Sequence, residues 1–309
     1  MSRAKITIVG AGNVGASCAQ RLAERDYADI VLLDIVEGLA EGKALDLSQA
    51  GPVAGYEPRV FGTSTYEATA GSDICVITSG LARRPGMSRD ELLGRNREIV
   101  ASVATAVAER SPDAILIVVT NPLDAMCHVA FDASAFPRAR VVGMAGILDS
   151  ARFRTFIAWE LGISARDVRG FVLGGHGEAM VPVVSYSTVA GVPVPQRIDA
   201  ARLREIVQRT KDGGAEVVGL LGEGSAYYAP SAGVAEMVDS IVLDRKRVVP
   251  CAALCQGEFG IEGTFVGVPC LLGGEGVEEI VELELDEDER RQLHASAESV
   301  RELVAEMGL

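Results

Sequence analysis

The segment GAGNVG at residues 10–15 constrains the fold of this 309-residue chain more than any other feature. It follows an apolar run at 5–9 and precedes a segment with helical periodicity, so its glycines fall between a predicted strand and a predicted helix. Gly10 permits a tight turn, Gly12 lets a ligand approach the backbone, and Gly15 lets the helix pack against the strand. The chain is therefore predicted to open with a βαβ unit whose first turn binds phosphate groups.

Asp34 makes this signal more specific. It ends the next apolar run, at 30–33, and lies about 20 residues beyond the glycine segment, the spacing of dinucleotide-binding βαβ units. A carboxylate there accepts hydrogen bonds from an adenosine ribose and repels a 2′-phosphate, so the pattern favours NAD over NADP. The alternative is that the glycines only form a turn and Asp34 only caps a strand.

The remainder of the first half alternates short apolar runs with helical patterns. The runs are nearly continuously apolar, as expected for strands that helices cover on both faces. We predict strands at 5–9, 30–34, 74–79, 114–119 and 140–143, with helices such as 13–25 and 90–109 between them. This alternation is typical of a Rossmann-type, doubly wound parallel sheet.

The pattern changes near residue 147. From there the sequence predicts a helix ending at Gly162, β-segments at 168–173, 181–189 and 192–198, helices at 199–221 and 227–243, a β pair at 247–255 and 264–271, and a final helix at 286–307. The chain is therefore predicted to be an α/β protein. A Rossmann domain that binds NAD, at 1–147, would precede an α+β domain for substrate and catalysis, at 148–309.

The composition limits the partners. The formal net charge of −14 disfavours nucleic acid and anionic membranes. No apolar run reaches the ~18–20 residues that span a bilayer, and the first strand starts too early for a cleavable signal, so a cytoplasmic protein is expected. The six cysteines form no CxxC pair and there are only three histidines, which predicts reduced thiols and no metal. Against this acidic background, residues 81–89 carry three arginines and no acid, which indicates a loop that binds a small anion.

His176 is the predicted acid–base residue. It follows the predicted strand 168–173, and the neighbouring glycines are expected to hold it in an open loop rather than in packed core. An unperturbed pKa of ~6.5 suits the movement of a hydroxyl proton near neutral pH. The alternative is a structural loop histidine, which is how His128 and His294 are interpreted.

Asp149 is the candidate partner that orients this histidine, although a plain helix N-cap is the alternative. Arg152 lies three residues further along the same predicted helix, so both side chains share one helix face. A carboxylate and a guanidinium presented together could serve a histidine and a substrate carboxylate at once.

Seven segments together resemble the lactate/malate dehydrogenase family, most closely its bacterial malate dehydrogenases of the lactate-dehydrogenase-like type. The resemblance covers essentially the whole chain, and its motifs are highly specific. They are GAGNVG, SGLARRPGMSRDEL, VTNPLDAM, GMAGILDSARFR, GGHGEAMVP, GSAYYAP and DRKRVVPCAA.

The resemblance implies a role for each matching residue. His176 would accept and donate the proton, and Asp149 would orient it. Arg152 would bind the carboxylate beside the reacting carbon, Arg89 would polarise the carbonyl, and Asn121 would contact the substrate oxygen and the nicotinamide. The family also has a cis bond before the proline at position 122. The implied cofactor contacts are Gly10, Gly12, Asn13, Val14, Gly15, Asp34, Asn96, Thr120 and Asn121.

Arg83 would select the substrate, because lactate dehydrogenases typically have glutamine at this position. An arginine would pair with the second carboxylate of malate or oxaloacetate, whereas pyruvate would leave it buried and unpaired, at a cost of ~3–5 kcal/mol. Surface charge is the alternative for Arg83, as it is the interpretation for Arg84. Glu178 and Ala179 depart from the family's GHGDTMVP, and only a tuning effect is expected from them.

The expected activity is the reversible NAD-dependent oxidation of malate to oxaloacetate by a homodimer or homotetramer. Two alternatives stay open: a lactate or other 2-hydroxyacid dehydrogenase of the same family, and a catalytically silent NAD-binding protein on the same fold.

Overall fold

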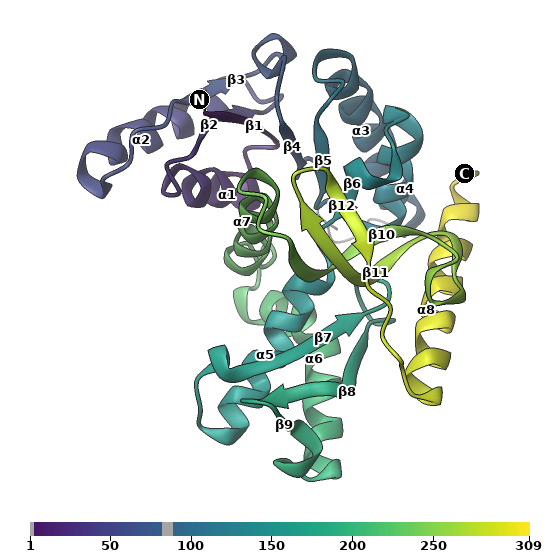
Figure 1. The fold of residues 1–309 in the computed structure, drawn as a ribbon. Helices are drawn as coiled ribbons and strands as arrows, with labels where there is room; N and C mark the ends of the chain where they lie inside the picture. Colours follow the sequence, from purple (N-terminus) through teal and green to yellow (C-terminus); the bar gives the residue numbers. More distant parts are fainter. Residues whose placement is uncertain (1–2, 82–88) are drawn as a thin grey trace.

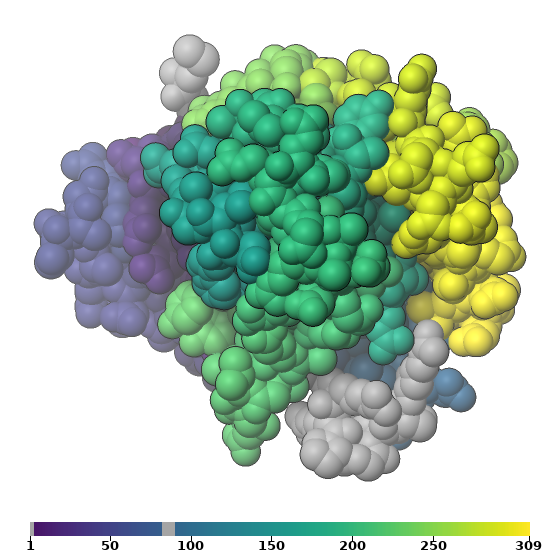
Figure 2. Space-filling view, turned by 90° about the horizontal axis from the view of Figure 1, so that it is seen from below, coloured from purple at the N-terminus to yellow at the C-terminus, as the bar shows by residue number. Residues whose placement is uncertain are grey.

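The computed structural model describes residues 3–81 and 89–309, with Arg89 described by its backbone alone. Arg83 and Arg84 lie outside the described residues. Figure 1 shows a central sheet with helices on both sides and a smaller β-region beneath it. In Figure 2, which views the molecule from below, the first strands and helices lie on one flank and the C-terminal helix lies on the other.

The first half alternates strands and helices as the sequence predicts. Its elements are β1 Ala4–Val9, α1 Asn13–Ala23, β2 Ala28–Leu33, α2 Leu39–Ala54, β3 Val60–Thr63, β4 Ile74–Ile77, α3 Arg89–Arg110, β5 Ile115–Val118, α4 Leu123–Ser134 and β6 Val141–Gly143. These six strands pair in parallel in the order β3-β2-β1-β4-β5-β6. That order is the one of a doubly wound Rossmann sheet, which confirms the predicted fold class.

The elements of the second half are α5 Gly146–Leu161, β7 Val168–Leu173, β8 Val181–Val189, β9 Val192–Pro193, α6 Ala200–Leu221, α7 Tyr228–Val242, β10 Arg247–Gln256, β11 Glu262–Gly273, β12 Gly276–Ile280 and α8 Glu287–Glu306. Strands β7, β8 and β9 form a separate small sheet. Strand β10 pairs antiparallel with β6, with Ala252 opposite Gly143, so β10, β11 and β12 continue the first sheet to nine strands in the part of the chain that the structure describes.

Apolar side chains from both halves cover the two faces of the large sheet. On one face, α1 and α7 pack against the sheet through residues such as Leu22 and Val238, and on the other α3, α4 and α8 pack through Val100, Met126 and Val300. A third cluster joins α5 and α6 to the small sheet. Because both halves share one sheet and these layers, residues far apart in the sequence are fixed relative to one another.

Three elements differ from the sequence-based expectation. Strand β3 at the sheet edge is not among the predicted strands, because its sequence, VFGT, is only four residues long and includes a glycine. The predicted strand 192–198 is a two-residue strand followed by a 3₁₀ turn, because the prolines at 193 and 195 each lack a backbone N–H for a ladder. Strand β12 was missed because its sequence, GVEEI, carries the charges of an exposed edge strand. The six cysteines are free and buried, as predicted. In the described part of the chain, no helix has the length and apolarity needed to cross a bilayer.

Candidate active site

The glycine segment forms the turn between β1 and α1. Gly10 has φ +107°, and its N–H donates to the carbonyl of Leu33 at 2.7 Å. A Cβ at Gly15 would lie 1.8 Å from the carbonyl oxygen of Gly10, so only glycine lets α1 approach the turn so closely. Gly12 is exposed, and a Cβ there would meet nothing within 4 Å. The exposed backbone at Gly12 and Asn13 therefore borders open space at the first turn of α1.

Asp34 lies across from this turn and is held by two backbone groups. Its Oδ2 accepts a hydrogen bond from the N–H of Ala11 at 2.6 Å, and its Oδ1 accepts one from the N–H of Val36 at 3.0 Å. The side chain thus connects the end of β2 to the glycine turn. A carboxylate fixed at this position is more than a strand cap, because one of its oxygens binds the turn itself.

A groove of about 560 Å³ runs past the carboxyl ends of β1, β2 and β4. Its lining includes Gly10, Gly12 and Asp34, and apolar side chains such as Ile35 and Ile99. Ile35 lies at this groove with 88% of its surface exposed, so a bound ligand could cover it. Ligands of open α/β sheets bind at this edge, where the strand order reverses.

Ser79 adds a polar atom to the same groove. Its Oγ is buried and has no hydrogen-bond partner among the described residues. Most buried side-chain polar atoms have a partner, so an unpartnered hydroxyl in a groove indicates a place for a ligand atom or water.

Asn96 joins the far end of the groove to the turn after β5. It is 1% exposed; its Oδ1 accepts from the N–H of Leu81 at 2.7 Å, and its Nδ2 donates to the carbonyl of Asn121 at 2.7 Å. The hydroxyl of Thr120 donates to the carbonyl of Ser79 at 2.7 Å. The peptide bond between Asn121 and the following proline is cis, as the resemblance predicts. Asn96 and Thr120 therefore act on the shape of the groove, while the side chain of Asn121 is exposed.

The loop that carries His176 is fixed by four elements in succession. Gly174 pairs with Gly267 of β11, and the N–H of Gly175 donates to the Oγ of Ser296 on α8 at 2.7 Å. The N–H of His176 donates to Oδ2 of Asp124 on α4 at 2.7 Å. The expectation of an open loop is therefore wrong. Positions 174 and 175 are crowded: a Cβ at Gly174 would lie 2.8 Å from the Ser296 hydroxyl, and one at Gly175 would lie 3.0 Å from Val300. Gly177 has open space around it and a φ of +128°, which favours glycine for its backbone conformation.

The fourth contact brings the three predicted chemical groups together. Nδ1 of His176 lies 2.8 Å from Oδ2 of Asp149, and the other carboxylate oxygen, Oδ1, accepts a hydrogen bond from Arg152 at 2.9 Å. A carboxylate only accepts, so Nδ1 carries the proton, and the neutral ring keeps a lone pair on Nε2. Asp149 is the fourth residue of α5, which excludes the N-cap alternative, because Ala145 occupies that position.

The charges around His176 favour its protonated form. Burial alone lowers the pKa of the imidazole, but the charge and hydrogen bond of Asp149, together with the charge of Asp124, outweigh burial and raise the pKa above its usual value of 6.5. The positive charge of Arg152 acts to lower the pKa of His176. The side chains of His176, Asp149 and Arg152 are 17%, 2% and 15% exposed, so the ring and the guanidinium can still meet a ligand.

The other two histidines have structural surroundings, as expected. Nε2 of His128 accepts the N–H of Phe265 at 3.0 Å, and burial lowers the pKa of His128 to about 4. His294 bonds the carbonyl of Phe259.

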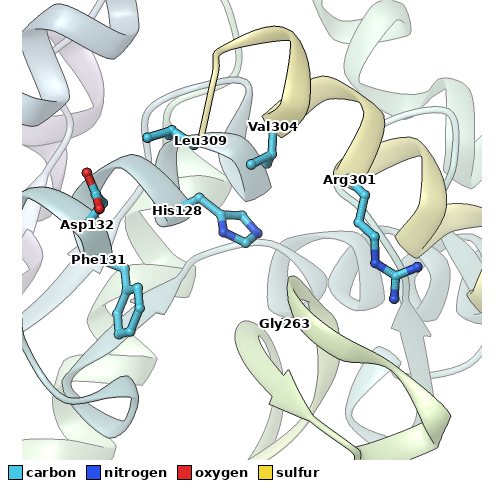
Figure 3. A pocket seen from close by; sticks show the side chains of 7 residues that line it. All are labelled: His128, Phe131, Asp132, Gly263, Arg301, Val304 and Leu309. Carbon is cyan, nitrogen blue, oxygen red and sulfur yellow. The ribbon is translucent and has the colours of Figure 1, made fainter.

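A separate cavity of about 360 Å³ lies beside α8 and shares no lining residue with the groove. Figure 3 shows the side chains that line it. Its lining is His128, Phe131, Asp132, Gly263, Arg301, Val304 and Leu309.

Three residues with direct contacts to the site carried no assigned role in the sequence. Asp124 and Ser296 hold the His176 loop, and Gly213 of α6 lies against the stem of Arg152. A lone acid in the mostly apolar segment LDAMCHVAF and a glycine pair inside a long helical pattern were signals for two of them. Arg89 is the first residue of α3, and its side chain lies outside the described residues, as does Arg83.

Comparison with known proteins agrees with this geometry. Two family models match: the NAD binding domain of lactate/malate dehydrogenase over residues 4–143, and the alpha/beta C-terminal domain of the same family over residues 147–307. The malate dehydrogenase of Thermomicrobium roseum is 59% identical over 305 residues, which cover 99% of this chain and 98% of that protein.

Solved structures give the same result. The malate dehydrogenase of Salinibacter ruber has a TM-score of 0.95 at 51% identity and covers 98% of this chain and 97% of its own. The lactate dehydrogenase of Cryptosporidium parvum, solved with lactic acid and NAD, has a TM-score of 0.96 at 40% identity and covers 99% of this chain and 98% of its own. The chain therefore belongs to the lactate/malate dehydrogenase family.

Proposed function

We propose that this chain is an NAD-dependent malate dehydrogenase that oxidises malate to oxaloacetate reversibly. The observation that carries the proposal is the contact set of His176, Asp149 and Arg152, which unites a proton acceptor, its orienting carboxylate and a carboxylate-binding guanidinium. A protein that only binds NAD needs no such set. The high identity to malate dehydrogenases supports malate as the substrate.

The residues of the groove fit NAD. The open backbone at Gly12 and the first turn of α1 suit a pyrophosphate, and Asp34 suits the adenosine ribose. Both bonds that Asp34 accepts come from backbone N–H groups, and no ion pair to it is seen among the described residues, so a 2′-phosphate would meet its negative charge. Asn13, Val14, Asn96, Thr120 and Asn121 complete the proposed cofactor set. Bound NAD supplies the hydride acceptor, and NADH the hydride donor.

The protein's own part in the reaction is proton transfer and orientation. With Nδ1–H donating to Asp149, Nε2 of His176 takes the hydroxyl proton of malate and returns it to the carbonyl oxygen of oxaloacetate. Asp149 stabilises the imidazolium that forms. The same carboxylate holds Arg152, so the acid–base group and the substrate-binding group share one rigid support.

Arg152 would bind the carboxylate next to the reacting carbon, in the bidentate geometry that a guanidinium favours. Arg83 and Arg89 are assigned by the family resemblance: Arg83 would pair with the second carboxylate and Arg89 would polarise the carbonyl.

We further propose that the chain divides into an NAD-binding domain at 1–147 and a catalytic domain at 148–309.

We also propose that the protein is a homodimer or homotetramer and that it is located in the cytoplasm. Helix α2 supports an oligomer, because Leu45 and Val53 on this helix are 61% and 91% exposed. Six free, buried cysteines suit a reducing compartment. Light scattering of the purified protein at several concentrations tests the oligomer; a monomer at micromolar concentration contradicts it.

The decisive experiment measures initial rates of NADH and NADPH oxidation with oxaloacetate and with pyruvate. The proposal expects kcat/KM to be highest with oxaloacetate and NADH. A preference for pyruvate would favour lactate dehydrogenase, the activity named for the Cryptosporidium parvum neighbour. NADH binding without turnover on either acid would favour a catalytically silent protein.

A further inference from the structure

Asp124 is a buried carboxylic acid directly behind the His176 loop. It lies in the first turn of α4 and is 5% exposed. Its Oδ2 accepts the N–H of His176 at 2.7 Å, whereas its Oδ1 is buried without a hydrogen-bond partner among the described residues. The acid–base step described above makes no use of this side chain.

A carboxylate is a costly anchor for a single N–H group. A neutral amide would accept the same hydrogen bond without bringing a charge into the interior, where an incompletely paired charge is strongly destabilised. Burial raises the pKa of Asp124 to about 6, even though the N–H and the charge of His176 act to lower it. At neutral pH the side chain is therefore largely ionised beside the imidazole.

The surroundings of His176 contain few other charges. Asp149 and Arg152 on α5 and Asp124 on α4 are the charged groups that act on the ring. The contacts from α8 and β11 come from the hydroxyl of Ser296 and from backbone. Gly175 keeps the approach close, since a Cβ there would lie 3.0 Å from Val300 and 3.4 Å from Oδ2 of Asp124.

We propose that Asp124 is a positioning residue for the acid–base step: it fixes the backbone of His176 and adds a second negative charge, beside that of Asp149, in support of the protonated imidazole. The role in turnover rests on the proposed function, but the electrostatic effect on His176 does not require any substrate. The two can therefore be tested separately.

The direct test is an NMR titration of the imidazole Cε1–H groups in the folded enzyme without substrate. The chain has only three histidines, so His176 can be assigned by comparison with a His176→Asn variant. Asp124→Asn keeps the shape of the side chain and an acceptor for the N–H, and removes the charge. The titration midpoint of His176 should move to lower pH in Asp124→Asn and stay in place in Asp132→Asn, an exposed acid on the same helix.

A His176 midpoint that does not move in folded Asp124→Asn overturns the proposal, whatever happens to turnover. If that variant fails to fold, the wild-type enzyme still decides the question, because ionisation of Asp124 should shift the backbone ¹⁵N signal of His176 between about pH 5 and 7. A signal that stays constant over this range contradicts the assigned role.

Kinetics and stability give independent readouts. Oxaloacetate reduction requires protonated His176, so in Asp124→Asn the alkaline limb of kcat/KM should move to lower pH. The expected loss of kcat/KM at pH 8 is roughly threefold or more, whereas NADH binding should stay unchanged.

The thermal stability should also depend on Asp124. Because the pKa of Asp124 in the folded state lies above its unfolded value of 3.8, this group destabilises the protein as the pH rises through about 6. Asp124→Asn should therefore raise the Tm relative to wild type more at pH 8 than at pH 4.

Discussion

Gly213 of α6 lies against the side chain of Arg152. A Cβ built on Gly213 would stand 3.1 Å from Cδ and 3.6 Å from Nε of the arginine. Each glycine inside a helix costs about 0.5–1 kcal/mol relative to alanine, and α6 carries a second one at Gly214. The pair gives the guanidinium room between two helices, so we infer that α6 helps to set the direction of the substrate-binding arginine.

Gly213→Ala should raise KM for malate and oxaloacetate by roughly threefold to tenfold and change kcat less, because the new Cβ forces the stem of Arg152 to shift by a few tenths of an ångström. A full displacement of about 1 Å in a positioning group costs about 10²-fold. Gly219→Ala is the matched control, since Gly219 lies in the same helix and a Cβ there meets nothing within 4 Å. Steady-state kinetics and Tm of both variants separate the two effects. Equal KM values in the two variants would show that Gly213 has no influence on Arg152.

His176→Asn should lower kcat by roughly 10²–10⁴, the usual contribution of general acid–base catalysis. NADH should still bind with its normal Kd, measured by fluorescence titration, because the groove residues are untouched. His294→Asn, on the exposed part of α8, is the control and should keep full turnover. Near-normal turnover of His176→Asn would remove the residue from its proposed role.

The pH dependence follows from the Asp149–His176 contact. Asp149 raises the pKa of His176, so the protonated form needed for oxaloacetate reduction persists to higher pH than for a free imidazole. In Asp149→Asn the alkaline limb of kcat/KM for oxaloacetate should move to lower pH. Because Oδ1 also holds Arg152, KM should rise as well. A pH profile identical to that of wild type would contradict the assigned pairing.

The sequence was sufficient where local pattern determines structure. Continuous apolar runs separated by helical segments predicted the parallel sheet, and the three-residue spacing of Asp149 and Arg152 predicted their shared helix face. The chemistry of histidine predicted a carboxylate partner, and Oδ2 of Asp149 lies 2.8 Å from Nδ1 of His176.

The sequence failed where the surroundings come from distant segments. The glycines beside His176 suggested an open loop, but Gly267, Ser296 and Asp124 close around it from β11, α8 and α4. No local pattern reveals these contacts, because each of them joins residues that lie 52 or more positions apart in the sequence. The continuation of the first sheet into β10–β12 was missed for the same reason.

Arg83→Gln should shift the substrate preference towards pyruvate. Loss of the guanidinium removes the proposed partner of the second carboxylate, and such a change alters selectivity by ~3–5 kcal/mol, or roughly two to three and a half powers of ten. The ratio of kcat/KM for oxaloacetate and pyruvate is the measurement. Arg84→Gln, a neighbouring arginine interpreted as surface charge, is the control. An unchanged ratio in Arg83→Gln would show that specificity is set elsewhere.

The glycine turn yields a prediction that separates folding from binding. Gly15→Ala should destabilise the protein by about 1–3 kcal/mol or more, because the new Cβ would lie 1.8 Å from the carbonyl oxygen of Gly10.

Gly12→Ala should leave the Tm nearly unchanged, because its Cβ meets no protein atom within 4 Å and its φ of −65° suits any residue. The same methyl group would stand where a pyrophosphate approaches, so the Kd for NADH should rise at least about tenfold, or 1.4 kcal/mol. Thermal unfolding and NADH titration of both variants check this, and normal NADH binding by Gly12→Ala would mean that the cofactor does not lie along this turn.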